Sequence, residues 1–178
     1  MSRSVIAAML LAAPVALFAQ PESIPIANAS FEEGEDAWSL PDGSMGEVTD
    51  EQAASGDYSL KIVDTDGDKG GSNVLGPRVP IDGKGSYELR FKTFPVTGSG
   101  CGIYVRVLDA DGNAAVPGDQ YQRGAPSSPA NEWVDASLRI FAPADARFLQ
   151  VWVHSYSHAI VTCYLDDFEL VEDDYQME

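Results

Sequence analysis

The sequence is short of basic residues. Its 178 residues include 28 Asp and Glu but only 11 Lys and Arg, which gives a net charge of −17. A chain this acidic repels phosphate backbones, so we expect no nucleic-acid partner. The charge is unevenly spread, because residues 76–165 contain eight acids and eight bases, including most of the arginines.

Cysteine is also scarce. Cys101 and Cys163 are too few for a disulfide scaffold, and no cysteine–histidine cluster suggests zinc. In an oxidising compartment the two residues either form one disulfide or stay separate as buried thiols. The sequence leaves both alternatives open.

The chain has one long hydrophobic run, at its N-terminus. Arg3 precedes an apolar stretch from Val5 to Phe18, and Ala19 is a small residue suited to cleavage. This pattern predicts a secretion signal over residues 1–19. The run is too short for a membrane span, and no second one follows. We expect a secreted protein, extracellular or periplasmic, with no membrane partner and with one domain over residues 20–178.

Amphipathic helices are lacking beyond the signal. Apolar and polar residues alternate instead in strand-length segments bounded by turn residues. About eight or nine strands are predicted, the clearest at 24–31, 59–63, 74–79, 87–91, 103–107, 134–140, 149–153 and 160–171. Strands with one apolar face each predict an all-β fold, a two-sheet antiparallel β-sandwich. Residues 115–131, rich in Pro, Gly and Ser, are expected to form a long loop.

The segment 147–156 has an unusual outward face. If its aliphatic residues face the core, the alternate residues face solvent, namely Phe148, Gln150, Trp152, His154 and Tyr156. Aromatic rings stack on sugar rings, while Gln and His side chains hydrogen-bond hydroxyl groups. The row therefore predicts a site for a polysaccharide or oligosaccharide. A bulge that shifts the register would instead place Trp152 in the core.

The same parity adds outward residues from other strands. These are Tyr104, Arg106, Glu88, Arg90 and Arg139. Three arginines on an acidic chain favour an anionic glycan such as a uronate polymer, although Glu88 and Arg90 alternatively form a simple surface ion pair. Exposed aromatic residues also suit a protein interface, so a secreted structural or adhesion protein is the alternative function.

Several short motifs share a familiar order. They are Asn28–Glu32, Trp38, Ser55–Leu60, Tyr87–Phe91, Trp133 and Tyr164–Leu170. Their order and spacing resemble the jelly-roll carbohydrate-binding modules, especially the cellulose- and xylan-binding families four, nine, sixteen and twenty-two. The resemblance spans about Ile24 to Glu172. It implies a jelly roll that binds glycans across an exposed sheet face and acts without catalysis.

The resemblance also implies a structural calcium site, with Glu32 and Asp166 as ligands. Ca²⁺ takes oxygen ligands and would neutralise carboxylates from opposite ends of the chain. The alternative is that both are exposed acids at strand ends. A second acidic stretch, 64–68, starts like an EF-hand loop, but Lys69 stands where that loop needs glycine. We therefore expect a solvated turn there.

Enzymatic activity is the less favoured possibility. Histidine is limited to His154 and His158, and neither lies near a nucleophile-elbow motif. No glycine-rich phosphate loop or cofactor fingerprint is present. Jelly-roll polysaccharide lyases typically pair a Tyr with a basic residue, which Tyr104, Arg106 and His154 would imitate, and a glycosidase needs only two opposed acids. We expect no catalysis.

Overall fold

The computed structural model describes residues 23–65, 67, 70–116, 120–126 and 130–173. The predicted signal at 1–19 lies outside the described residues. Eight strands form one antiparallel sheet: β1 (Ser23–Ile24), β2 (Gly46–Thr49), β3 (Ser59–Asp64), β4 (Val74–Pro80), β5 (Gly85–Leu108), β6 (Gln120–Gly124), β7 (Val134–Ala142) and β8 (Phe148–Asp173). No helix among these residues is long and apolar enough to cross a membrane.

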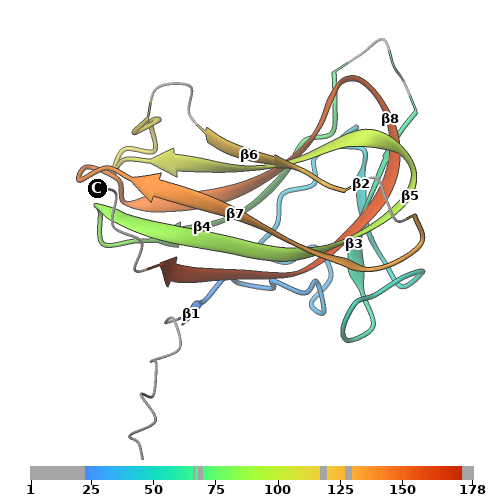
Figure 1. Cartoon of the computed structure of the whole chain (residues 1–178), viewed down its shortest axis with the longest axis horizontal. Coiled ribbons are helices and arrows are strands. Elements are labelled where there is room, and N and C mark those ends of the chain that lie inside the picture. Colours follow the sequence, from blue (N-terminus) through green and yellow to red (C-terminus); the bar gives the residue numbers. More distant parts are fainter. Residues whose placement is uncertain (1–22, 66, 68–69, 117–119, 127–129, 174–178) are drawn as a thin grey trace, which may run out of the picture.

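Two long strands, β5 and β8, fold the sheet into a sandwich. The first half of β5 pairs with β7 and with the second half of β8, whereas its second half pairs with β6 and with the first half of β8. Figure 1 shows both strands crossing between the layers at the same end of the molecule. We call the layer with β4, β6, residues 101–108 and residues 148–155 the upper layer. The lower layer contains β7, residues 85–95, residues 160–173 and the short strands β1, β2 and β3.

Glycine permits the crossing in β5. The β5–β8 register shifts between Pro95 and Thr97 and again between Ser99 and Cys101. Between these shifts lies Gly98, with φ +71°, where an added Cβ would stand 1.8 Å from the carbonyl oxygen of Ile160. Only a residue without a side chain allows β8 this close in that conformation.

The core fills the space between the layers. Inward residues of β5 and β8 are almost fully buried, including Leu89, Phe91, Ile103, Val105, Val151 and Val153. The Trp38 ring packs 4.8 Å from Phe31 and 5.3 Å from Phe168, and Phe91 stacks 5.6 Å from Phe168. The predicted all-β sandwich is confirmed.

The predicted elements differ from the structure in three places. The strand expected over 24–31 ends at Ile24, and the φ values of Asn28 and Phe31, 49° and 62°, exclude an extended backbone at those two residues. The Asn28 amide stabilises the resulting turn by donating to the carbonyl oxygens of Gly34 and Asp36, both at 2.9 Å. The loop expected over 115–131 contains β6, which pairs with β5. Finally, 87–91 and 103–107 are parts of one strand, as are 149–153 and 160–171.

Candidate functional site

The upper layer presents the outward row that the alternation predicts. Leu149, Val151 and Val153 are at most 5% exposed and belong to the core. Their neighbours Phe148, Gln150, Trp152, His154 and Tyr156 are all partly exposed. No bulge interrupts the β5–β8 register between Phe148 and Ser155, so Trp152 faces outward. On β5, Tyr104 lies opposite Trp152, and Arg106 lies opposite Gln150.

Four rings on this face form a cluster that we call the aromatic platform: Tyr104, Trp152, His154 and Tyr156. The Trp152 and His154 rings stack, with centroids 4.5 Å apart and planes at 29°. Tyr104 packs 5.0 Å from Trp152 and edge-on to His154 and Tyr156, at 6.0 and 6.3 Å. Packing on both sides leaves Tyr104 only 7% exposed, and this burial raises the pKa of its hydroxyl. The platform is thus a continuous apolar floor.

The segment before β4 fixes the two central rings. The Trp152 indole N–H donates to Asn73 Oδ1 at 3.1 Å, and His154 Nδ1 lies 2.5 Å from the carbonyl oxygen of Ser72. Because a carbonyl only accepts, we assign the His154 proton to Nδ1. In that tautomer Nε2 is an acceptor.

A buried polar network supports that segment. Two reciprocal hydrogen bonds join Ser72 and Ser155. The Ser72 backbone N–H donates to the Ser155 hydroxyl at 2.6 Å, and the Ser155 backbone N–H donates to the Ser72 hydroxyl at 2.7 Å. The Ser155 hydroxyl donates in turn to the Asp64 carboxylate at 2.6 Å. All three residues are at most 1% exposed, so the backbone that holds Trp152 and His154 is itself fixed from below.

Polar groups continue the face beside the platform. Gln150 is oriented by donating its amide to the carbonyl oxygen of Gly76 at 2.9 Å, and its own oxygen accepts from Arg106 Nη1 at 3.3 Å. Arg78 of β4 lies opposite Gln150, and Gln122 of β6 lies opposite Tyr104. Phe148 ends the row, between Pro80 and Leu108.

Sequence reasoning missed Ser72, Asn73 and Arg78 as residues of this face, and it placed Gln122 only in the 115–131 loop, which it considered functional. Arg78 and Gln122 lie on strands β4 and β6, so only the cross-strand pairing brings them beside Gln150 and Tyr104. Ser72 and Asn73 precede β4 and carry no motif. The alternation in 147–156 was the available signal, and it identifies one strand at a time.

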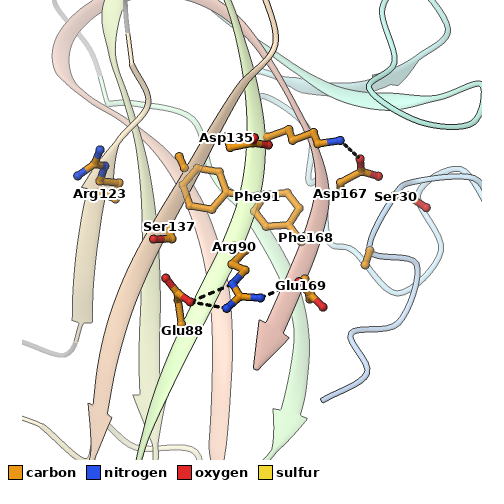
Figure 2. A pocket seen from close by; sticks show the side chains of 13 residues that line it. Ser30, Glu88, Arg90, Phe91, Arg123, Asp135, Ser137, Asp167, Phe168 and Glu169 are labelled. Carbon is orange, nitrogen blue, oxygen red and sulfur yellow. Dashed lines mark hydrogen bonds and ion pairs between the residues drawn. The ribbon is translucent and has the colours of Figure 1, made fainter. Parts of the chain in front are cut away.

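Glu88, Arg90 and Arg139 do not join the platform. They lie on the lower layer, where Glu88 pairs with Arg139 across β5 and β7. Arg90 makes ion pairs with Glu88 at 2.8 Å and with Glu169 at 3.6 Å, as Figure 2 shows, and Arg139 pairs with Asp173 at 2.7 Å. The parity was right, but β5 changes layer between Arg90 and Tyr104. The prediction that all ten residues share one face was therefore wrong.

The lower layer carries its own hollow, an open groove of about 850 Å³ that we call the charged groove (Figure 2). Its lining includes Glu88, Arg90, Lys92, Arg123, Asp135 and Asp167. Lys92 is paired with Asp167 at 3.0 Å. The rings that line it, Phe91 and Phe168, are only 2% and 4% exposed. Among the described residues, this groove has no exposed aromatic ring for a sugar, so we favour the platform.

The two predicted calcium ligands hold one turn from two sides. The Glu32 carboxylate accepts from the backbone N–H groups of Asp57 and Tyr58, at 3.0 to 3.1 Å. Asp166, fully buried, accepts from the N–H groups of Ala54 and Ser55 at 2.8 and 3.3 Å. Carboxylates are suitable Ca²⁺ ligands, but six to eight oxygens are needed, and no group of three or more His, Cys, Asp or Glu among the described residues is placed to hold a metal. Calcium stays a prediction.

Cys101 and Cys163 are free thiols in the structure, and both are 1% exposed. The Cys101 thiol beside it and burial raise the pKa of Cys163. The two side chains are therefore neighbours, and the structure corresponds to the buried-thiol alternative.

Solved structures share this architecture. The chain matches a family 16 carbohydrate-binding module at 20% identity and a TM-score of 0.62, covering 83% of this chain and 99% of the module. It matches the CBM22-1 xylan-binding domain of Paenibacillus barcinonensis Xyn10C at 20% identity and 0.60, covering 88% and 97%. The chain has the fold of these carbohydrate-binding modules.

The same fold also occurs in an enzyme. A cyclase from Fischerella sp. TAU matches at 12% identity and a TM-score of 0.67, covering 89% of this chain and all of the cyclase. No protein-family model and no curated protein matches the chain by sequence. The comparisons therefore confirm the predicted jelly-roll resemblance as a likeness of fold, and the function has to be argued from the site.

Proposed function

We propose that this chain is a secreted, non-catalytic protein that binds a polysaccharide or oligosaccharide on the aromatic platform. One observation carries the proposal: the rings of Trp152, His154 and Tyr156 are partly exposed on a sheet face and pack against the buried Tyr104. A solvated sheet face normally carries polar side chains, so exposed rings need another explanation. Aromatic rings can stack on the apolar face of a pyranose. The fold shared with carbohydrate-binding modules supports the same conclusion.

Hydrogen-bonding groups beside the rings give the proposed site its polarity. His154 Nε2 accepts, Arg106 retains N–H donors beyond the one given to Gln150, and Gln122 has both kinds of group. Because strands and the network under Ser72 hold these groups, little side-chain entropy is lost on binding. The face is open, so it suits a chain that continues beyond the site.

The test is a binding screen of polysaccharides with the variant Trp152→Ala. We expect binding to at least one polymer, weakened about tenfold or more by the substitution, which is the usual cost of losing a central aromatic contact. Trp133→Ala is the matched control, because Trp133 packs 5.4 Å from Phe94 in the lower layer. Equal effects of the two substitutions would contradict the platform. If the folded protein binds no polymer, the platform is better explained as a protein interface, and sedimentation should then show association.

Catalysis has a separate readout. A lyase acting on uronate polymers forms unsaturated products that absorb ultraviolet light. We expect no rise in absorbance with any polymer that binds, and a rise abolished by substituting Tyr104 would overturn the non-catalytic assignment.

A further inference from the structure

We propose that the platform recognises an acidic glycan, with a sugar ring on Trp152 and a uronate carboxylate on Arg106. This inference rests on the proposed function and names the ligand class of the same site. It is based on which basic residues form ion pairs with carboxylates in the structure and which do not.

Most cations of the lower layer are already neutralised. Lys61 is paired with Glu47 and Glu51 at 3.3 and 2.7 Å. Arg90, Lys92 and Arg139 also have carboxylate partners within 3.0 Å. A glycan carboxylate would have to displace one of these partners, so this layer offers little to an anion.

The upper layer differs. Among the described residues, neither Arg78 nor Arg106 has a carboxylate within ion-pair distance. Arg123 and Arg147 also have no ion pair among these residues, so Arg78 and Arg106 are distinguished by their position beside the platform. Both residues lie opposite Gln150, so the row Arg78–Gln150–Arg106 crosses three strands beside the platform.

Gln150 orients Arg106 without neutralising it. The amide oxygen of Gln150 accepts one N–H from Arg106 Nη1 at 3.3 Å. A guanidinium has five N–H donors in a planar fork, which leaves enough for a two-point contact with a carboxylate. Because the side chain is partly buried, such a contact is less screened by water than a surface ion pair.

The spacing suits one sugar unit. Tyr104 and Arg106 are alternate residues of β5, and Trp152 and Gln150 are alternate residues of β8. Two residues along a strand span roughly 6.6 Å, which is about the length of a pyranose with its exocyclic carboxylate. Arg106 is the diagonal neighbour of Trp152 on the adjacent strand, about 4.8 Å further across. The long Arg106 side chain therefore has to reach across that spacing to meet the carboxylate of a ring stacked on Trp152.

Arg78 extends the positive row toward the 109–113 turn. Its guanidinium lies by Gly112, where an added Cβ would stand 3.0 Å from both terminal nitrogens. That turn contains two acids, Asp109 and Asp111, and neither is within ion-pair distance of Arg78. Asp109 accepts from the backbone N–H groups of Asp111 and Asn113 at 2.9 and 2.8 Å. These bonds lower the pKa of Asp109 and hold its carboxylate within its own turn. More distant acids are screened beyond about 8 Å at physiological salt.

The experiment compares polymers in native and carboxyl-reduced form. Polygalacturonate, glucuronoxylan, alginate and hyaluronan are used, since reduction converts each uronate into the corresponding neutral sugar. We expect at least one native polymer to bind about tenfold or more tightly than its reduced form, because charge-assisted hydrogen bonds to arginine are lost. Arg106→Gln should weaken binding of the native polymer much more than binding of the reduced polymer, so that the difference between the two forms largely disappears. Arg106→Lys should retain part of the difference, and added salt should reduce it.

Arg123→Gln is the matched control. Arg123 also has no carboxylate within ion-pair distance among the described residues, but it lies opposite the core residue Ile103 and borders the charged groove. If Arg123→Gln, rather than Arg106→Gln, removes the preference for the acid, the acid site is the groove and the proposal fails. Equal binding of native and reduced polymers also overturns it, while Trp152→Ala would still support the proposed function. Failure of every polymer, neutral or acidic, overturns both.

Discussion

Gly56 is a position where one added methyl group should destabilise the protein for two reasons that can be separated. It has φ +61°, and an added Cβ would stand 2.4 Å from the carboxyl carbon of Glu32. The substitution Gly56→Ala therefore imposes two penalties. An L-residue in the left-handed region costs about 1–2 kcal/mol, partly offset because alanine restricts the unfolded chain. The clash also displaces the Glu32 carboxylate from the N–H groups of Asp57 and Tyr58.

The second penalty can be isolated with Gly34. That glycine has a similar φ of +68°, but nothing lies within 4 Å of its added Cβ. Gly34→Ala therefore carries the backbone penalty alone, about 1 kcal/mol. Loss of two hydrogen bonds adds about 1 kcal/mol each for Gly56→Ala. A difference of about 2 kcal/mol corresponds to a gap in Tm of about 4–8 °C between the two variants in a domain this size.

The assay is thermal unfolding followed by circular dichroism, with chelator present so that metal binding does not contribute. A double-mutant cycle with Glu32→Ala then tests the cause. In the Glu32→Ala background, Gly56→Ala should cost no more than Gly34→Ala, because the clashing carboxylate is gone. Equal Tm values for the two single glycine variants would refute this reasoning.

Three further predictions concern the same region and the core. If Glu32 and Asp166 bind calcium, Ca²⁺ should raise the Tm by an amount that grows with its concentration. Asp166→Asn should abolish this rise. If Ca²⁺ does not raise the Tm of the wild-type protein, the calcium prediction is wrong. Burial raises the pKa of Asp166, although backbone N–H groups lower it in part. Its contribution to stability is therefore present at acid pH and is lost as the pH rises through the folded pKa. As the pH falls toward the usual aspartate pKa of 3.8, the Tm difference, wild type minus Asp166→Asn, should become more positive. The reverse trend would show that the N–H groups affect the pKa of Asp166 more than burial does. Cys101 and Cys163 should react with a thiol reagent only after unfolding, because both are buried and the pKa of Cys163 is raised. Labelling of the native protein would contradict their burial. Absence of labelling in denaturant would show that the two residues form a disulfide.

The sequence predicts the fold because alternation is a local property. Leu149, Val151 and Val153 face the core on their period alone, and the opposite face follows from it. The layer to which a face belongs is not local. Arg90 and Tyr104 are outward residues of one strand, but the crossing at Gly98 places them on opposite sides of the molecule.

The hydrogen-bond partners of the site residues could not be predicted from the sequence either. Asn73 precedes a different strand from the Trp152 that it contacts, 79 positions away. The strand predicted at 24–31 was wrong because the chain turns at Asn28 and Phe31. Hydrogen bonds from the Asn28 side chain stabilise the left-handed backbone there, and the spacing of apolar residues does not reveal such bonds. Periodicity therefore found the faces, and only the pairing of strands found the site.

The crossing of β5 and β8 also bears on how the protein unfolds. The same two strands run through both layers and pair along most of their length, so the two layers share their central strands. Amide hydrogens of the two layers should then exchange through one cooperative opening. A glycan bound to the upper layer would slow exchange in the lower layer by the same factor, since a ligand stabilises the whole unit that must open.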